Sequence, residues 1–189
     1  MTKEYYKTDK SVEEYIKAAE GFDGAEHIGQ LKTYLPSGST LLEIGTGPGS
    51  DWEILHTDYD VTGSDFSKQF LERLDEKFPS GEFLELDAAT LLTQQKFDGI
   101  YSNKVLHHLN DEEMQSSIYR QHDILNPDGV ICHSFWEGQG SEIFKGMFVK
   151  YHTMDSLKGL FETRFEILLM EYYNEFEDDD SILLIARKK

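Results

Sequence analysis

The chain has 189 residues, 39% hydrophobic and 13% aromatic, which is enough for one globular domain with a sizeable core. Asp and Glu total 36 against 18 Lys and Arg, so the formal net charge is −18. A field of that sign repels nucleic-acid phosphates and anionic lipid headgroups, and we expect neither nucleic acid nor membrane as a partner. No apolar run is long enough to span a bilayer, the first residues lack the apolar region of a secretory signal, and Cys132 is the single cysteine. These features favour a reducing, cytoplasmic location.

The first 39 residues predict a helical cap or lid. Residues 11–14 have the spacing of a capping box and open a helix through about residue 20. A second helix is expected over about 25–35, ended by Pro36-Ser37-Gly38. Three tyrosines of this region belong either to a closing lid or to amphipathic helices that cover the sheet edge: Tyr5, Tyr6 and Tyr15.

From residue 40 onward, strand patterns alternate with helix patterns. Strands are predicted at 40–44, 60–64, 82–86, 97–102, 130–135, 165–173 and 181–187. Helices are predicted at 50–55, 67–78, 111–125 and 153–161. The turn residues Asn126–Gly129 precede the fifth strand, and the acidic stretch Asn174–Asp180 predicts a solvated hairpin loop rather than a metal site. The alternation predicts an α/β, doubly wound sheet that ends in a hairpin.

A glycine-rich loop follows the first strand and is the strongest functional signal in the chain. Glu43 ends an apolar run, and Gly45, Gly47 and Gly49 follow it. Glycines let a ligand approach the backbone closely. Asp65 stands 20 residues after Gly45, at the tip of the second strand, where doubly wound folds bind ribose hydroxyls.

Two kinds of cofactor use this geometry. The dinucleotide fingerprint would place Ser50 where a third glycine is expected, and it brings a pyrophosphate to the helix N-terminus. Glu43 would repel a pyrophosphate but suits a ligand that carries an ammonium and a sulfonium. The pattern therefore favours the second kind of cofactor.

The motif Glu43-x-Gly45-x-Gly47-x-Gly49 resembles motif I of the class I S-adenosylmethionine-dependent methyltransferases. The resemblance covers about residues 40–189 and only loosely the first 40. It implies a Rossmann-like doubly wound, seven-stranded sheet of order 3-2-1-4-5-7-6 with strand 7 antiparallel. We expect a single domain over 1–189, with a cap at 1–39 and a core at 40–189.

The resemblance also implies a role for each cofactor-binding residue. Glu43 and the loop, including Thr46, would flank the methionine moiety, and Asp65 would accept the ribose hydroxyls. Phe66 would lie against the adenine, and Asp87 with the Ala88 amide would meet its amino group, although Asp87 is alternatively a helix cap. Ser102 follows the fourth strand, where family members place groups that face the methyl donor. Ser102-Asn103-Lys104 departs from the Asn/Asp-Pro-Pro-Tyr/Phe pattern of enzymes that methylate nucleobases or glutamine, which disfavours those substrates.

Two adjacent histidines, His107 and His108, follow the fourth strand and are the candidate catalytic residues. One of them would face the acceptor as an orienting group or general base, or at least one would pack beneath the strand. Because neighbouring helical residues diverge by about 100°, we expect only one of them to face the substrate. They also lack a partner at i+4, and no metal is predicted. Trp136, Tyr151 and His152 are expected near the acceptor pocket, with core packing as the alternative for Trp136.

The sequence thus predicts an enzyme that transfers a methyl group from S-adenosylmethionine to a small-molecule acceptor by in-line displacement. Three alternatives remain open at this point: an NAD(P)-dependent oxidoreductase, a cofactor-binding regulatory or scaffold protein without catalysis, and an enzyme that uses the same cofactor for another reaction.

Overall fold

The computed structural model describes residues 12–14, 16–17, 21 and 23–189. Residues 12–14 and 16–17 are helical, as expected for the first helix of the cap. The expectations that rest on Tyr5, Tyr6, Ser11 and Tyr15 lie outside the described residues.

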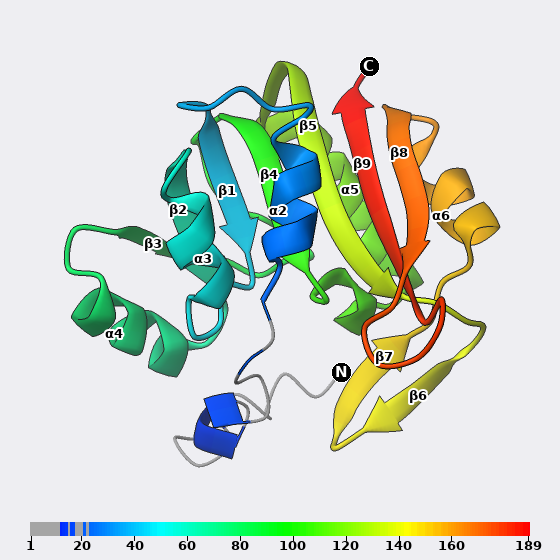
Figure 1. The fold of residues 1–189 in the computed structure, drawn as a ribbon, viewed down its shortest axis with the longest axis horizontal. Coiled ribbons are helices and arrows are strands. Elements are labelled where there is room, and N and C mark those ends of the chain that lie inside the picture. Colours follow the sequence, from blue (N-terminus) through cyan, green and yellow to red (C-terminus); the bar gives the residue numbers. More distant parts are fainter. Residues whose placement is uncertain (1–11, 15, 18–20, 22) are drawn as a thin grey trace.

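A seven-stranded sheet runs through the molecule, with helices on both of its faces (Figure 1). Its order is β3-β2-β1-β4-β5-β9-β8. The strands are β1 (Thr40–Ile44), β2 (Asp60–Asp65), β3 (Glu82–Glu85), β4 (Phe97–Asn103), β5 (Leu125–Trp136), β8 (Phe165–Tyr173) and β9 (Ser181–Lys188). The first five are parallel, whereas β9 runs antiparallel to both β5 and β8. The predicted order, with its last strand antiparallel, is confirmed.

Two hydrophobic clusters attach the helices to opposite faces of the sheet. The helices are α2 (Ala25–Leu31), α3 (Ser50–Leu55), α4 (Lys68–Lys77), the 3-10 turn η2 (Leu106–His108), α5 (Asp111–Ile124) and α6 (Met154–Phe161). Helices α2 and α3 bury Ile28 and Leu55 against one face. The other face is covered by η2, α5 and α6, whose buried side chains include Leu106, Ile118 and Phe161. The strand ends that carry the candidate site residues therefore lie between two layers of helices.

Side-chain caps begin three of the helices where the sequence indicates. The Ser67 hydroxyl accepts a hydrogen bond from the Phe70 N–H at the start of α4. Asn110 and Glu113 form a reciprocal capping box on α5, and Thr153 does the same with Ser156 on α6. Such caps satisfy N–H groups that have no partner within the helix and define its first residue.

Two boundaries differ clearly from the sequence prediction, and one hairpin was not predicted. Helix α2 ends at Leu31 rather than near Leu35. Strand β5 begins at Leu125, because the expected turn at 126–129 is absorbed as a register shift in its pairing with β4, with Asp128 at φ +61°. A second sheet was not predicted: strands β6 (Ser141–Phe144) and β7 (Met147–Lys150) form a hairpin of their own.

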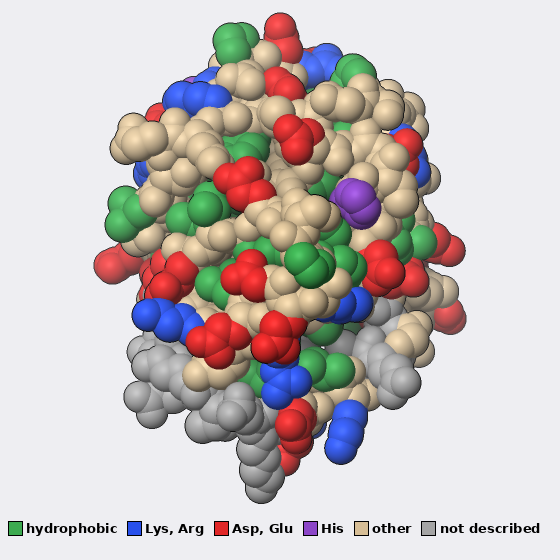
Figure 2. All heavy atoms as spheres, turned by 90° about the vertical axis from the view of Figure 1, so that its left-hand side faces the viewer, with side chains coloured by type: hydrophobic (Ala, Val, Ile, Leu, Met, Phe, Trp, Pro, Cys, Tyr) green, Lys and Arg blue, Asp and Glu red, His purple; other side chains and the backbone are tan. Residues whose placement is uncertain are grey.

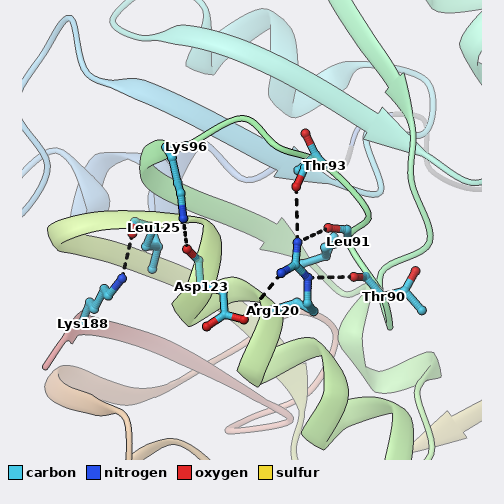
Figure 3. Close-up of polar contacts among 8 residues, drawn as sticks. All are labelled: Thr90, Leu91, Thr93, Lys96, Arg120, Asp123, Leu125 and Lys188. Carbon is cyan, nitrogen blue, oxygen red and sulfur yellow. Dashed lines mark hydrogen bonds and ion pairs between the residues drawn. The ribbon is translucent and has the colours of Figure 1, made fainter.

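Arg120 joins α5 to the segment that connects β3 with β4. Its guanidinium donates to the carbonyls of Thr90, Leu91 and Thr93, at 3.2 to 3.3 Å (Figure 3). Leu91 has a φ of +42°, an uncommon conformation for a side chain of this size. The arginine therefore satisfies three carbonyls of an irregular loop and fixes it to the helix layer.

The surface agrees with the acidic composition. Figure 2 shows acidic side chains spread over the face that β3 and α4 cover, with lysines and arginines between them. In the part of the chain that the structure describes, no helix is long and apolar enough to cross a membrane.

Candidate active site

The loop that follows β1 is bound to the end of β2 by three hydrogen bonds. The N–H groups of Gly45 and Thr46 donate to the Ser64 carbonyl at 2.8 and 2.9 Å, and the Thr46 hydroxyl accepts from the Ser64 N–H at 2.9 Å. Gly45, Gly47 and Gly49 have φ values of +73°, +52° and +85°. Because residues with a Cβ rarely adopt this region, the backbone itself favours glycine at all three positions.

Two of these glycines also lie against side chains of the protein. A Cβ on Gly45 would stand 2.6 Å from Val105 Cγ2, and one on Gly49 would stand 2.8 Å from Leu74 Cδ2 and from Phe78 Cε2. Close packing is thus one reason for their missing Cβ atoms, beside the ligand approach that the sequence suggested. The Val105 contact also joins the exit of β4 to this loop and brings the two halves of the candidate site together.

Glu43 lies beneath the loop, and one of its carboxyl oxygens has no hydrogen-bond partner among the described residues. The residue is 3% exposed, and nothing in the described part of the chain bonds its Oε2. Burial raises the pKa of the Glu43 carboxyl well above its ordinary value, and the nearby Asp51 and Asp65 carboxylates add to the rise, while a hydrogen bond with the Thr46 hydroxyl opposes it. A cation placed here would both pair with the carboxyl and favour its ionisation.

Asp65 ends β2 with its carboxylate turned toward the glycine loop. Its Oδ2 accepts from the Gly47 N–H at 3.1 Å, and its Oδ1 accepts from the Ser67 N–H at 2.9 Å. Burial raises the pKa of Asp65 to about 6, although bonds from the N–H groups of Ser67, Gly47 and Phe66 lower it. A carboxylate has about four lone-pair sites, so Asp65 retains the capacity to accept a further hydroxyl.

Asp87, which follows β3, caps the backbone after the strand, in line with the alternative to its adenine-binding role. Its Oδ1 accepts from the Ala89 N–H at 2.9 Å, and its carbonyl accepts from the Thr90 and Leu91 N–H groups. Asp87 therefore caps a turn, and a ligand would share its carboxylate with that role. Ala88, like Phe66, is partly buried.

Ser102 belongs to a buried polar chain that runs between β4, β5 and α5. Its hydroxyl lies 2.8 Å from His133 Nδ1, and His133 Nε2 lies 2.8 Å from Gln121 Oε1. The Gln121 amide then donates to the Ser117 hydroxyl at 3.1 Å. These hydrogen bonds hold the Ser102 side chain in the protein interior. A cofactor role for the Ser102 hydroxyl stays a prediction, and it would compete with the hydrogen bond to His133.

His107 and His108 lie together in η2, at the exit of β4. Their Nε2 atoms are 3.1 Å apart, and their ring centroids are separated by 4.0 Å. The expectation that the two side chains diverge is wrong, because η2 is one short 3-10 turn in which both rings fold toward each other. His108 Nδ1 also lies 2.7 Å from the Phe148 carbonyl of β7. Burial lowers the pKa of both imidazoles, that of His107 most strongly.

Lys104 is a site residue that the sequence analysis did not single out. Its ammonium stands 3.3 Å from the centre of the Trp136 ring and donates to the Phe135 carbonyl at 3.1 Å and to the Ser181 hydroxyl at 2.6 Å. Burial lowers the pKa of Lys104 to about 7, while Glu175 and Asp180 raise it. The cation beside Trp136 is therefore a lysine of the chain itself, and its φ of +53° is the feature that no sequence pattern announced.

Asp51 also escaped the sequence analysis, although it lies in the first turn of α3. Its Oδ2 accepts from the Tyr101 hydroxyl at 2.8 Å and from the Asn103 amide at 3.1 Å. Tyr101 and Asn103 alternate along β4 and share a face, so Asp51 fastens α3 to the end of that strand. An acid at the start of a helix reads as an ordinary first-turn charge, which is why sequence alone gave no reason to choose it.

Tyr151 and His152, expected near the acceptor, line a pocket of about 450 Å³ between the β6–β7 region and α6. Gly138 and Lys150 contribute to the same wall. His152 is 1% exposed, and its ring packs edge-on against Phe135 at 5.3 Å. Within the described ranges, no group of three or more His, Cys, Asp or Glu side chains is arranged to hold a metal ion.

Comparison with known proteins gives consistent matches. The family model described as "Methyltransferase domain" matches residues 41–129. An uncharacterised methyltransferase of Oceanobacillus iheyensis is 28% identical over 157 residues, covering 78% of this chain and 69% of that protein. A trans-aconitate 2-methyltransferase of Variovorax paradoxus is 34% identical over 102 residues, covering 52% of this chain and 39% of that protein. The fold matches the structure of 1,6-didemethyltoxoflavin-N1-methyltransferase from Burkholderia thailandensis with a TM-score of 0.80 and 19% identity, over 94% of this chain and 83% of that one. That structure contains 1,6-didemethyltoxoflavin and S-adenosylhomocysteine.

Proposed function

Because the chain belongs to the class I S-adenosylmethionine-dependent methyltransferase family, we propose that it transfers a methyl group from S-adenosylmethionine to a small-molecule acceptor. One observation carries the proposal: the buried carboxyl of Glu43 and the carboxylate of Asp65 flank the glycine loop at the same edge of the sheet. Ligands of open α/β sheets bind outside this edge.

The donor set fits the cofactor. Glu43 Oε2, which no described residue bonds, suits an ammonium, and the carboxylate of Asp65 suits the ribose hydroxyls. Phe66 offers an aromatic face for the adenine, and Asp87 with the Ala88 amide would meet its polar edge. When bound, the cofactor supplies an activated methyl group, which an acceptor's lone pair takes as the carbon–sulfur bond breaks and its electrons remain on sulfur.

The chain's own contribution is to position the two reactants. The contact between Val105 and Gly45 fixes the exit of β4 beside the cofactor loop, so that a group bound near η2 lies close to the methyl donor. Holding reactants in line supplies roughly 7–11 kcal/mol of the barrier reduction in favourable cases. His107 and His108 are the candidate groups that orient the acceptor, or remove its proton.

The relatives support a small acceptor. One is named for trans-aconitate and another for 1,6-didemethyltoxoflavin, and neither name concerns nucleic acid. The net charge of −18 and the single, buried Cys132 support a partner other than nucleic acid and a cytoplasmic setting.

The acids at the start of α3 count against the dinucleotide alternative. Asp51 and Glu53 lie in the first turn of this helix, where a pyrophosphate would have to sit. Negative side chains there oppose a dianionic ligand, whereas they favour the net positive charge of S-adenosylmethionine.

The experiment that tests the proposal measures S-adenosylhomocysteine formation in the presence of panels of amine, hydroxyl and carboxylate acceptors. We expect acceptor-dependent product from at least one panel, and the Asp65→Ala variant serves as the negative control. If the cofactor binds but no acceptor gives product, catalysis would have to be abandoned in favour of a regulatory role.

A further inference from the structure

The hydrogen bonds around the two histidines define which nitrogen of each ring carries its proton. A carbonyl oxygen can only accept, so His108 Nδ1, 2.7 Å from the Phe148 carbonyl, is the protonated nitrogen of that ring. In the neutral ring, His108 Nε2 then carries a lone pair and can only accept. His107 Nε2, 3.1 Å away, must be the donor to it. His107 Nδ1 is therefore the unprotonated nitrogen of its ring and carries a lone pair.

Among the residues that the structure describes, that lone pair has no hydrogen-bond partner. No group in the described ranges bonds His107 Nδ1, although the residue is only 4% exposed. A buried acceptor without a donor costs on the order of 1–3 kcal/mol, so a ligand that donates a hydrogen bond to it recovers that cost. The atom lies two residues beyond Val105, which contacts the cofactor loop.

The surroundings oppose a positive charge on this ring. Burial is the largest cause of the lowered pKa of His107, and the positive charge of Lys104 at the exit of β4 adds to it. The ring is therefore suited to accept a hydrogen bond and poorly suited to take a proton before methyl transfer.

We infer that the acceptor is an uncharged nitrogen nucleophile that carries an N–H, which it donates to His107 Nδ1, with His108 as the positioning residue. This inference rests on the proposed function and names the substrate class of the same site. Such a nitrogen attacks with its own lone pair and releases its proton to water after methylation. A hydroxyl would have to lose its proton first, and a carboxylate would set its oxygens against the Nδ1 lone pair.

The first test is a long-range ¹⁵N–¹H correlation spectrum of the imidazole groups in the full chain with S-adenosylhomocysteine. The signals are assigned with His107→Gln and His108→Gln, and His56→Gln serves as the matched control because His56 is exposed just after α3. We expect both rings to be neutral at pH 7.5, with the proton on Nδ1 in His108 and on Nε2 in His107. His108→Phe removes the Nε2 atom that accepts from His107, so the His107 proton should no longer be confined to Nε2. A proton on His107 Nδ1, or an imidazolium at either position, would overturn the inference.

The second test uses three probes on one ring: aniline, phenol and benzoate. Aniline and phenol should shift the His107 Nδ1 signal, whereas benzoate should not. With methyl-labelled S-adenosylmethionine, N-methylaniline should be the product, and His107→Gln should reduce its formation by about tenfold, as for the loss of one buried hydrogen bond. Anisole or methyl benzoate as the main product would overturn the substrate class, whereas bound cofactor with no product from any probe would count against the proposed catalysis.

Failure of the proposed function would look different. In that case S-adenosylhomocysteine would leave the amide signals of the glycine loop unchanged. The proton positions on His107 and His108 could still be measured, because they do not depend on cofactor binding. Binding of S-adenosylhomocysteine combined with the wrong tautomers would reject this inference alone.

Discussion

Gly24 is held against Asp51 by a hydrogen bond that leaves no room for a side chain. The Gly24 N–H donates to Asp51 Oδ1 at 2.6 Å. A Cβ on Gly24 would stand 2.0 Å from the Tyr101 hydroxyl oxygen and 2.8 Å from Asp51 Oδ2. The carboxylate that fastens α3 to β4 thus also anchors the chain just before α2, at the edge of the sheet where the cofactor is proposed to bind.

Gly24→Ala should therefore destabilise the protein by about 1–3 kcal/mol, as overpacking of a tight site does. Urea unfolding would measure the change. Gly29→Ala is the matched control, because Gly29 lies inside α2 with open space around it and should gain about 0.5–1 kcal/mol. Equal effects of the two substitutions would contradict the anchoring role of Gly24.

Gly47→Val should abolish cofactor binding while far-UV circular dichroism stays near wild type. The residue has a φ of +52°, and valine there costs about 1–2 kcal/mol of backbone strain and moves the N–H that Asp65 accepts. Gly38→Val carries the same strain, at φ +82°, in open space away from the loop. Unchanged affinity in the Gly47 variant, or an equal loss in the Gly38 variant, would show that the loop is misplaced.

Binding of the cofactor should release protons at neutral pH. The pKa of Glu43 is raised in the free protein, and a cation beside the carboxyl lowers it, so affinity should rise with pH. Calorimetry in two buffers of different ionisation enthalpy would count the protons. Glu43→Gln should release fewer, and proton uptake by the wild-type protein on binding would speak against this role.

His133 should make part of the stability sensitive to acid. Burial lowers the pKa of His133 to about 3, below the unfolded value of about 6.5. The sign follows from linkage: the stabilisation is present above pH 6.5 and is lost as the pH falls from there toward 3. His133→Gln should cost about 2 kcal/mol at pH 7.5, through the loss of bonds to Ser102 and Gln121, and less at pH 5. A difference in unfolding free energy that stays constant between these pH values would exclude the linkage.

The sheet order could be predicted because buried parallel strands and the terminal hairpin leave clear apolar patterns, and β1 and α3 have the predicted bounds. The β6–β7 hairpin could not, since its turn residues, Lys145 and Gly146, adopt positive φ without the Asn-Gly or Asp-Gly pair that announces such turns. The division of the chain at residue 39 stays a prediction.

The candidate site likewise has a part that could be predicted from the sequence and a part that could not. Glu43, the glycines and Asp65 follow strand ends and are visible as a motif. The pairing of His107 with His108, and of Lys104 with Trp136, depends on a 3-10 turn and on a left-handed backbone residue that tertiary contacts impose. Sequence periodicity carries no information on either.

The most direct measurement of the central claim is a calorimetric titration of the protein with S-adenosylmethionine and, in parallel, with NADH. S-adenosylmethionine should bind at one site and NADH should not bind. Asp65→Ala should weaken the S-adenosylmethionine affinity by at least about tenfold, because hydrogen bonds to a charged group contribute roughly 1.5–3 kcal/mol each. Binding of NADH in place of S-adenosylmethionine, or a loss smaller than about threefold in the Asp65 variant, would contradict the assignment of this edge of the sheet as the methyl-donor site.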